Sequence, residues 1–175
     1  MKRRFLLATM GASVVLFACA PRPTPVVKKP EPLPKTADRV VVLKGERKLM
    51  LKAGDRTLRT YTVSLGRTPV GHKLREGDGK TPEGLYTLDY RNPDSQFYRS
   101  IRISYPSPAD RERARKRGVS PGGDIMIHGL PNGEGWIGKD HAQFDWTEGC
   151  IAVTNEEMDE IWAMVSEGTP IEIRP

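Results

Sequence analysis

Apolar and polar residues alternate in a series of short segments between positions 39 and 175. This alternation has the period of a β-strand with one buried face. Only two stretches have the spacing of a helix, so the pattern predicts a mainly β domain with accessory helices. The eight expected strands are 39–44, 47–52, 57–65, 85–90, 100–105, 125–128, 151–153 and 171–174, and Gly45-Glu46 is expected to form a two-residue hairpin turn between the first two.

The two helices are expected at 110–117 and after Thr154. The first is dense in arginine and ends at Gly118, which predicts a solvated basic face, with contact to an anionic glycan or lipid as the alternative. The second begins with a capping box of Thr154 and Glu157 and is stopped by Gly168. Its apolar residues form one stripe that belongs to the core: Met158, Ile161, Trp162 and Val165.

Residues 1–19 have the organisation of a bacterial lipoprotein signal peptide. Three basic residues precede an apolar run over 5–17, which is too short to span a bilayer comfortably. The run ends in Leu16-Phe17-Ala18-Cys19, which resembles a lipobox. Cys19 is therefore the predicted lipidation site, with simple cleavage near Ala18 or Ala20 as the alternative. This predicts a lipoprotein of the cell envelope that faces the periplasm, and Ala20 favours the outer membrane.

A linker and one domain are predicted to follow. Residues 20–38 contain six prolines and little that is apolar, which favours a stiff, extended spacer, and 39–175 is the expected domain. The formal charge is +6, but the three basic residues at 2–4 leave with the signal. The remaining mild excess favours anionic envelope polymers. Without interleaved aromatic and basic residues, nucleic acid is not an expected partner.

Cys150 is the candidate for the chemistry of this domain. If Cys19 carries lipid, Cys150 is the remaining thiol, and polar residues at 145, 147 and 148 set it apart from a core cysteine. A thiol titrates near pH ~8.5 and needs a base to act as a nucleophile at neutral pH. His128 ends an apolar run 22 positions earlier, so the fold has to bring the two together. A buried, inert cysteine is the alternative.

Gly149 suits a sharp turn with positive φ, which would leave its own N–H and that of Cys150 free to bind an oxyanion. The loop 66–84 is long and rich in glycine and charge, which is typical of a functional loop. Its spacing does not match a phosphate-binding loop. His72, within it, is a candidate substrate contact. A zinc site is the rival hypothesis, with His72, His128, His141 and Cys150 as its ligands, but none of them has a tight metal spacing.

Ile127-His128-Gly129 and Thr147-Glu148-Gly149-Cys150 resemble the motif of the L,D-transpeptidase catalytic domain, or YkuD, family. The segment 81–86 and the capped helix after the cysteine also match, and the resemblance extends over about 39–175. The amino-acid sequence at 77–84 and 145–153 is similar to that of the YafK-like branch. The resemblance implies a β-sandwich in which Cys150 is the nucleophile, His128 the base and the Gly129 carbonyl the group that orients it. Gly149 and Cys150 would supply the oxyanion donors, and Thr147 and Glu148 would line the substrate site.

The implied reaction is acyl transfer in peptidoglycan, with no metal or organic cofactor. Cys150 would form a thioester with diaminopimelate of a stem peptide. The acyl group would then pass to an amine, which gives a cross-link or attaches an envelope lipoprotein, or to water. A hydrolase that releases a bound lipoprotein and a non-catalytic peptidoglycan-binding module are the alternatives. Glu148 replaces the histidine of the family motif, and Ala152 replaces a common arginine. These two changes put acceptor choice and carboxylate recognition in question.

Overall fold

The computed structural model describes residues 34–175. The predicted signal peptide with Cys19 and most of the predicted linker lie outside the described residues. The Ala37 N–H donates to the Met164 carbonyl (2.9 Å), and the Asp38 N–H donates to the Lys52 carbonyl (2.8 Å). The chain is therefore bonded to the domain from Ala37 onward. None of the helices within 34–175 is long and apolar enough to cross a bilayer.

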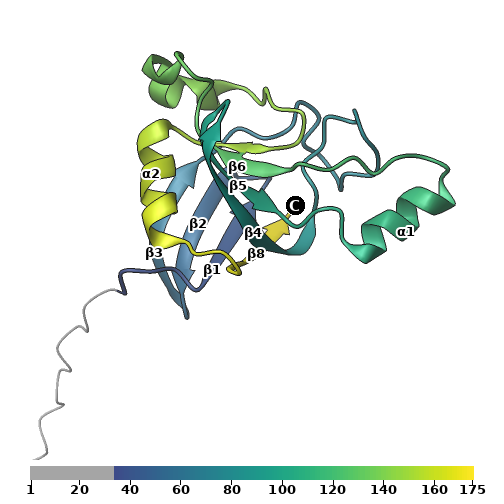
Figure 1. Cartoon of the computed structure of the whole chain (residues 1–175), viewed down its shortest axis with the longest axis horizontal. Coiled ribbons are helices and arrows are strands. Elements are labelled where there is room, and N and C mark those ends of the chain that lie inside the picture. The colour runs from purple at the N-terminus through teal and green to yellow at the C-terminus, as the bar shows by residue number, and fades with distance from the viewer. Residues whose placement is uncertain (1–33) are drawn as a thin grey trace, which may run out of the picture. The chain divides into compact units, whose positions relative to one another are not determined.

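All eight predicted strands are present, and they join into one sheet (Figure 1). The order across the sheet is β3-β2-β1-β8-β4-β5-β6-β7. The strands are β1 (Arg39–Leu43), β2 (Lys48–Ala53), β3 (Arg56–Thr62), β4 (Gly84–Ser95), β5 (Tyr98–Ile103), β6 (Met126–His128), β7 (Ile151–Ala152) and β8 (Pro170–Arg174). The expectation of a mainly β domain is confirmed.

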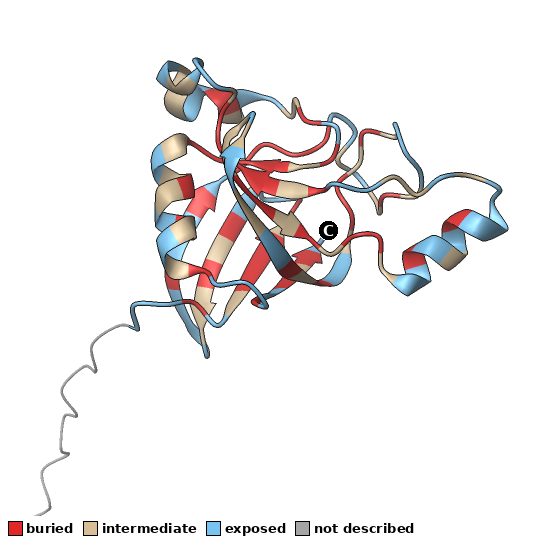
Figure 2. Cartoon of the chain, viewed as in Figure 1, coloured by how far each residue is buried: buried red, intermediate tan, exposed pale blue. Residues whose placement is uncertain are grey.

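The long strand β4 lets the sheet curl. Its first half pairs with β8 and its second half with β5, both antiparallel, and the pairing with β5 is interrupted by two register shifts. Apolar side chains from both halves of the sheet, such as Val42 and Leu51 on one and Ile101 and Ile127 on the other, belong to one buried core (Figure 2). The predicted sandwich is thus formed by a single curled sheet.

The helices agree with the sequence prediction in position and differ in their bounds. α1 (Pro108–Lys116) begins two residues early, because Ser107 and Asp110 form a capping box, and it projects away from the sheet (Figure 1). α2 (Asn155–Met164) has the predicted capping box of Thr154 and Glu157. It ends before Gly168, because Val165 is already extended (φ −117°, ψ 125°).

The pattern missed one element and misjudged one turn. The 3-10 helix η1 (Gly135–Gln143) was not predicted; Gly138 interrupts it with φ 52° and ψ −135°. The turn between β1 and β2 has four residues and not two, since Leu43 pairs with Lys48. Arg47 closes it with φ 52°, and its guanidinium donates to the Lys44 carbonyl (2.6 Å).

Lys44, in this turn, binds the loop 66–84 at Gly71 and again near the C-terminal end of the loop. Its ammonium donates to the carbonyls of Gly71 (2.7 Å) and Thr81 (2.8 Å), and to the Glu83 carboxylate (2.8 Å). The Lys44 side chain is only 3% exposed. Burial lowers the pKa of Lys44, while the Glu83 carboxylate acts in the opposite direction. The loop that borders the site described below is therefore held by a buried charge.

We expect Lys44→Ala to lower the free energy of unfolding by about 3–5 kcal/mol, because it leaves buried carbonyls and a partly buried carboxylate without their partner. Chemical denaturation monitored by tryptophan fluorescence measures this. Lys48→Ala is the matched control. The ion pair of Lys48 with Glu46 is exposed, so the loss should stay below about 1 kcal/mol. Equal losses of unfolding free energy in the two variants would contradict the proposed role of Lys44 in holding the loop 66–84.

Candidate active site

Strand register brings His128 and Cys150 together. β6 and β7 are parallel, with Ile127 opposite Ile151 and His128 opposite Ala152. Side chains alternate between the faces of a sheet. Ile127 and Ile151 point into the core, so His128 and Cys150, which lies one residue before β7, face the other way. They are diagonal neighbours on adjacent strands.

The turn that carries Cys150 requires glycine at position 149. Gly149 has φ 133°, a conformation that residues with a side chain rarely adopt. A Cβ at this position would lie 2.6 Å from the Lys80 carbonyl oxygen. The predicted positive φ is confirmed, and the structure adds a second reason for glycine, which is close packing against the loop 66–84.

Thr147 closes this turn with its hydroxyl group. The hydroxyl donates to the Cys150 carbonyl (2.8 Å) and accepts from the Gly149 N–H (3.1 Å). The expectation that the Gly149 N–H is free is therefore wrong for this state of the protein. Thr147 is 5% exposed and acts as a brace of the turn, a role that its position in the motif did not reveal.

His128 is a neutral, oriented imidazole. Its Nδ1 lies 2.7 Å from the Gly129 carbonyl oxygen. A carbonyl only accepts, so Nδ1 carries the proton and Nε2 is left as an acceptor. Burial lowers the pKa of His128 to about 4, although the Gly129 carbonyl opposes this shift. The predicted orienting role of Gly129 agrees with this contact.

Two aromatic rings hold the imidazole in place. The ring of Phe97 lies 4.6 Å from that of His128, and the ring of Trp146 lies 5.8 Å from it, edge to face. Phe97 comes from the turn between β4 and β5, and Trp146 from the segment that leads to the cysteine. Neither was predicted as a site residue. Because their apolar rings exclude water, they contribute to the burial that keeps His128 uncharged.

The thiol of Cys150 is half-buried and protonated. Burial raises the pKa of Cys150, while a hydrogen bond from the Met126 backbone acts against the rise. The sulfur lies 3.6 Å from the Asp124 carbonyl oxygen, to which the thiol donates. Asp124 presents this carbonyl from a backbone with φ 52°. In this state the proton of the thiol is therefore directed at Asp124 and not at His128.

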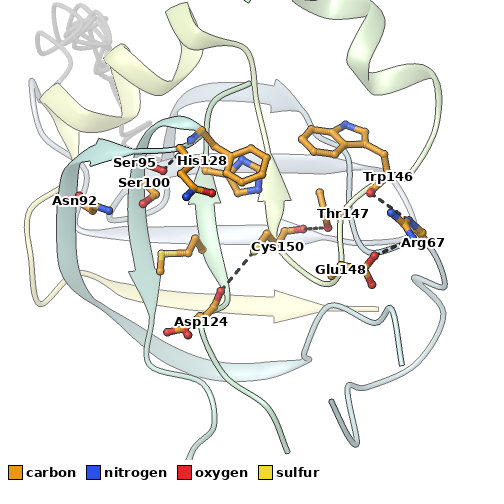
Figure 3. Close-up of a pocket in the computed structure, with 13 residues that line it drawn as sticks. Arg67, Asn92, Ser95, Ser100, Asp124, His128, Trp146, Thr147, Glu148 and Cys150 are labelled. Carbon is orange, nitrogen blue, oxygen red and sulfur yellow. Dashed lines mark hydrogen bonds and ion pairs between the residues drawn. The ribbon is translucent and has the colours of Figure 1, made fainter. Parts of the chain in front are cut away.

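Cys150 and His128 line the same cavity of about 500 Å³ (Figure 3). This volume is in the range of sites for small ligands. A second cavity of about 250 Å³ meets Cys150 from the side of the loop 66–84. Asp124 and Glu148 line both cavities. The first is lined by Arg67, Asn92, Ser95, Gln96, Phe97, Ser100, Asp124, Met126, His128, Trp146, Thr147, Glu148 and Cys150.

Arg67 is a cation at the mouth of the larger cavity that sequence reasoning missed. Its guanidinium pairs with Glu148 at 2.8 Å, and both side chains are 65% exposed. The Arg67 N–H donates to the Thr147 carbonyl (3.0 Å), which ties this residue to the segment that carries the cysteine. No local pattern marks Arg67, because it enters the site through pairing with a segment 80 positions away.

The structure does not bring His72 or His141 to this pair. His72 accepts from the Glu83 N–H through Nδ1 (3.0 Å), and its Nε2 lies 3.0 Å from a carboxylate oxygen of Asp110, away from both cavities at Cys150. His141 is buried, and its Nδ1 lies 3.2 Å from the Ser64 hydroxyl. Within residues 34–175, no three histidine, cysteine or acidic side chains are grouped as metal ligands would be.

A curled, mainly β domain with a cysteine and a histidine in one cleft is the arrangement that the sequence resemblance implied. Comparison with protein families agrees with it. Residues 37–173 match the L,D-transpeptidase catalytic domain, YkuD. The chain belongs to this family.

Individual proteins show the same relationship. The chain is similar to the YafK protein of Escherichia coli K12, with 32% identity over 133 residues, which cover 73% of this chain and 46% of YafK. Among solved structures it resembles the helical cell shape determining protein Pgp2 of Campylobacter jejuni, with a TM-score of 0.58, 27% identity and coverage of 77% of this chain and 46% of Pgp2. The chain thus spans about half the length of these relatives.

A further solved structure shows the fold alone. The L,D-transpeptidase of Mycobacterium smegmatis superposes with a TM-score of 0.52 at 16% identity, over 78% of this chain and 58% of that protein. The curled sheet is therefore shared at a level where the sequences have largely diverged.

We expect the stability of the protein to fall between pH 7 and pH 4 because of His128. In this window the unfolded chain binds a proton at position 128 that the native state, with a pKa of about 4, excludes. The loss amounts to about 3 kcal/mol. Chemical denaturation at several pH values should show a weaker pH dependence for His128→Asn. Burial also lowers the pKa of His141. Because His141 is present in both the wild type and His128→Asn, the difference between their pH dependences isolates the contribution of His128. Parallel curves would contradict the assignment.

Proposed function

We propose that this protein is a cysteine acyltransferase that acts on peptidoglycan stem peptides. The observation that carries the proposal is the pairing of Cys150 and His128 in one cavity, with Nδ1 of the histidine fixed on the Gly129 carbonyl. The nitrogen that remains unprotonated is the one that a thiol needs as its base. Membership in the L,D-transpeptidase family supports the substrate class.

The reaction begins from a neutral pair and not from a thiolate and an imidazolium. Burial disfavours both charges, since it raises the pKa of the Cys150 thiol and lowers that of His128. As the sulfur attacks the carbonyl of diaminopimelate, its proton passes from the thiol to Nε2. The histidine then gives this proton to the amine that leaves, and a thioester remains. The thiol first has to turn away from the Asp124 carbonyl.

The thioester then passes to a second amine or to water. His128 takes the proton of the attacking group and returns it to the sulfur, so the enzyme is regenerated without a cofactor. An amine of another stem peptide gives a cross-link, whereas water gives hydrolysis, which includes release of a bound envelope lipoprotein. Two cavities are lined by Cys150, which supports separate places for the acyl donor and the acceptor.

The oxyanion that forms during attack needs backbone donors. Because the Gly149 N–H donates to the Thr147 hydroxyl, it becomes available only if that bond opens. The Cys150 N–H is the other predicted donor, and the turn fixed by Gly149 and Thr147 sets its direction. Thr147 therefore acts on catalysis by positioning these donors.

Arg67 serves as the cation that recognises a carboxylate of the acyl donor. The family motif places a histidine where this chain has Glu148, and Arg67 supplies a positive charge from a different segment. Its pair with Glu148 is exposed and is worth about 0–1 kcal/mol at most. A substrate carboxylate that binds the guanidinium in a bidentate manner can displace Glu148 at small cost.

The protein acts in the cell envelope as a lipoprotein that faces the periplasm. A lipid on Cys19 attaches it to the membrane, and the proline-rich linker separates the domain from the membrane surface. The sequence of residues 1–38 supports this location, and the outer membrane is the proposed site. A lipid anchor of this kind keeps the domain close to peptidoglycan.

Cys150→Ala is expected to abolish turnover while the protein stays folded. Purified sacculi and soluble muropeptides are incubated with either protein, and products are analysed by mass spectrometry for a gained cross-link, a lost residue or a released peptide. Thermal unfolding of the variant serves as the folding control. Product formation at the wild-type rate by Cys150→Ala would rule out the thiol mechanism. Absence of turnover by both proteins, with binding retained, would favour a non-catalytic binding module.

Arg67→Ala is expected to lower kcat/KM by about 10- to 100-fold for donor peptides with a free terminal carboxylate. A loss of this size corresponds to the removal of one hydrogen-bonded charge pair between enzyme and substrate. Donors that end in an amide should be affected less than about twofold. Steady-state kinetics with both peptides measure the discrimination. Arg59→Ala is the control, since Arg59 also pairs with an exposed glutamate, Glu160, and does not line the cleft. Equal losses for both donors would contradict carboxylate recognition.

A further inference from the structure

A basic groove lies between the loop 66–84 and the C-terminal end of α1. From its charge and its position we propose that it is a second binding site, which holds carboxylate groups of the peptidoglycan polymer while one stem peptide reacts at Cys150. This proposal rests on the proposed function, since it identifies the reacting polymer as the ligand. The groove has a volume of about 470 Å³, and three cations line it: Arg75, Lys80 and Arg117.

These three cations have little to neutralise them. Within the described part of the chain, the Arg75 guanidinium has one hydrogen-bond partner, the Glu76 carbonyl at 3.4 Å. Across residues 34–175, neither the Lys80 ammonium nor the Arg117 guanidinium has a hydrogen-bond or ion-pair partner. By contrast, other cations on α1 are paired, Arg113 with Asp110 and Arg115 with Glu112. Among the described residues Arg111 of α1 also lacks such a partner, but the groove gathers three cations without a carboxylate partner on one concave surface.

One carboxylate lines the groove, and its hydrogen-bonding capacity is already used. Asp78 accepts from the Lys73 ammonium (3.0 Å) and from the N–H groups of Leu74 (2.7 Å), Arg75 (3.1 Å) and Lys80 (3.1 Å). Lys73 is buried and balances the charge of Asp78. The side chains of Arg75, Lys80 and Arg117 thus remain available for an anion from outside.

The groove adjoins the smaller of the two cavities at Cys150. The smaller of the two cavities at Cys150 is lined by Glu76, Gly77 and Gly122, and Gly77 also lines the basic groove. Glu76 ties the two walls together, because its N–H donates to the Ser120 carbonyl (2.9 Å) and its carboxylate accepts from the Ser120 hydroxyl (3.0 Å). Because the smaller cavity and the groove share Gly77, the proposal places a polymer that leaves Cys150 through this cavity next to the three cations.

The chemistry of the groove fits a polymer that carries separate carboxylates. Arginine binds carboxylate in a bidentate manner, and lysine adds a point charge. Stem peptides present free carboxylates at intervals along the glycan. An anionic membrane is a flat surface that favours protruding basic and apolar side chains, whereas here the cations surround a hollow in which Leu74 and Val119 are partly buried. The geometry thus favours peptidoglycan over a lipid surface.

The test compares two double variants with the same change in charge. Arg75→Glu/Arg117→Glu reverses two cations of the groove. Arg111→Glu/Arg115→Glu reverses two cations of α1 that do not line it. Binding to purified sacculi is measured by co-sedimentation in the Cys150→Ala background, so that it does not depend on catalysis. We expect the groove variant to bind at least tenfold more weakly, and the α1 variant to stay within about twofold of the parent.

Measurements of turnover distinguish the role of the groove from that of the cleft at Cys150. With Cys150 present, the groove variant should lose activity on sacculi through KM, while its turnover of a small soluble muropeptide stays within twofold. If neither substrate is turned over by any protein, the proposed function fails, whereas the binding comparison still tests the groove. Arg75→Gln/Arg117→Gln replaces the reversal variant if thermal unfolding shows that the latter is destabilised.

Three results would overturn the proposal. Equal weakening by both double variants would show a general effect of net charge. Unchanged binding to sacculi in the groove variant would show that the groove is not used. Loss of binding to phosphatidylglycerol vesicles, with binding to sacculi retained, would assign the groove to a lipid surface.

Discussion

The close approach of Gly149 to the carbonyl of Lys80 is the contact on which the site depends. It joins the turn that carries Cys150 to the loop 66–84, and no side chain fits between them. Gly66 meets the same constraint, since a Cβ there would lie 2.2 Å from the Gly79 carbonyl oxygen. Backbone packed this tightly has few alternative arrangements. The direction of the thiol is therefore set by main-chain contacts, which the Thr147 hydroxyl then reinforces.

Polar contacts hold the two segments that meet here, which are the segment leading to Cys150 and the loop 66–84. Arg47 binds the Asp145 carboxylate through Nε (3.0 Å) and through a terminal nitrogen (2.7 Å), and Asp145 also accepts from the Leu65 N–H (2.9 Å). On the other side, the buried ammonium of Lys44 holds the loop. Both anchors come from the turn between β1 and β2, which is remote from the cleft along the chain. The rigidity of the site thus originates in a turn that takes no part in the chemistry.

The electrostatics of the cleft follow from burial. Apolar rings around His128 remove water and leave a neutral imidazole with one free nitrogen, and the same burial keeps the thiol protonated. A neutral pair avoids two charges in a poorly solvated place. Charge is kept at the rim, where Arg67 and Glu148 are exposed, and in the basic groove. The loop 66–84 supplies Arg67, one wall of the smaller cavity and two cations of the groove, so a single segment connects the proposed reaction with the proposed binding of the polymer.

The sequence alone determined what depends on neighbours in the chain. Alternation predicted all eight strands, the pair Thr154 and Glu157 predicted the start of α2, and the motifs predicted the glycine turn before Cys150 and pointed to Cys150 and His128, which the structure places in one cavity. It missed η1, where Gly138 breaks the helical pattern, and it missed Arg67, Phe97 and Trp146. Their roles arise only when strand register and loop packing bring distant segments to one cleft. The same packing directs His72 to Asp110, because polar contacts form between groups that are close in space, and local pattern does not encode that proximity.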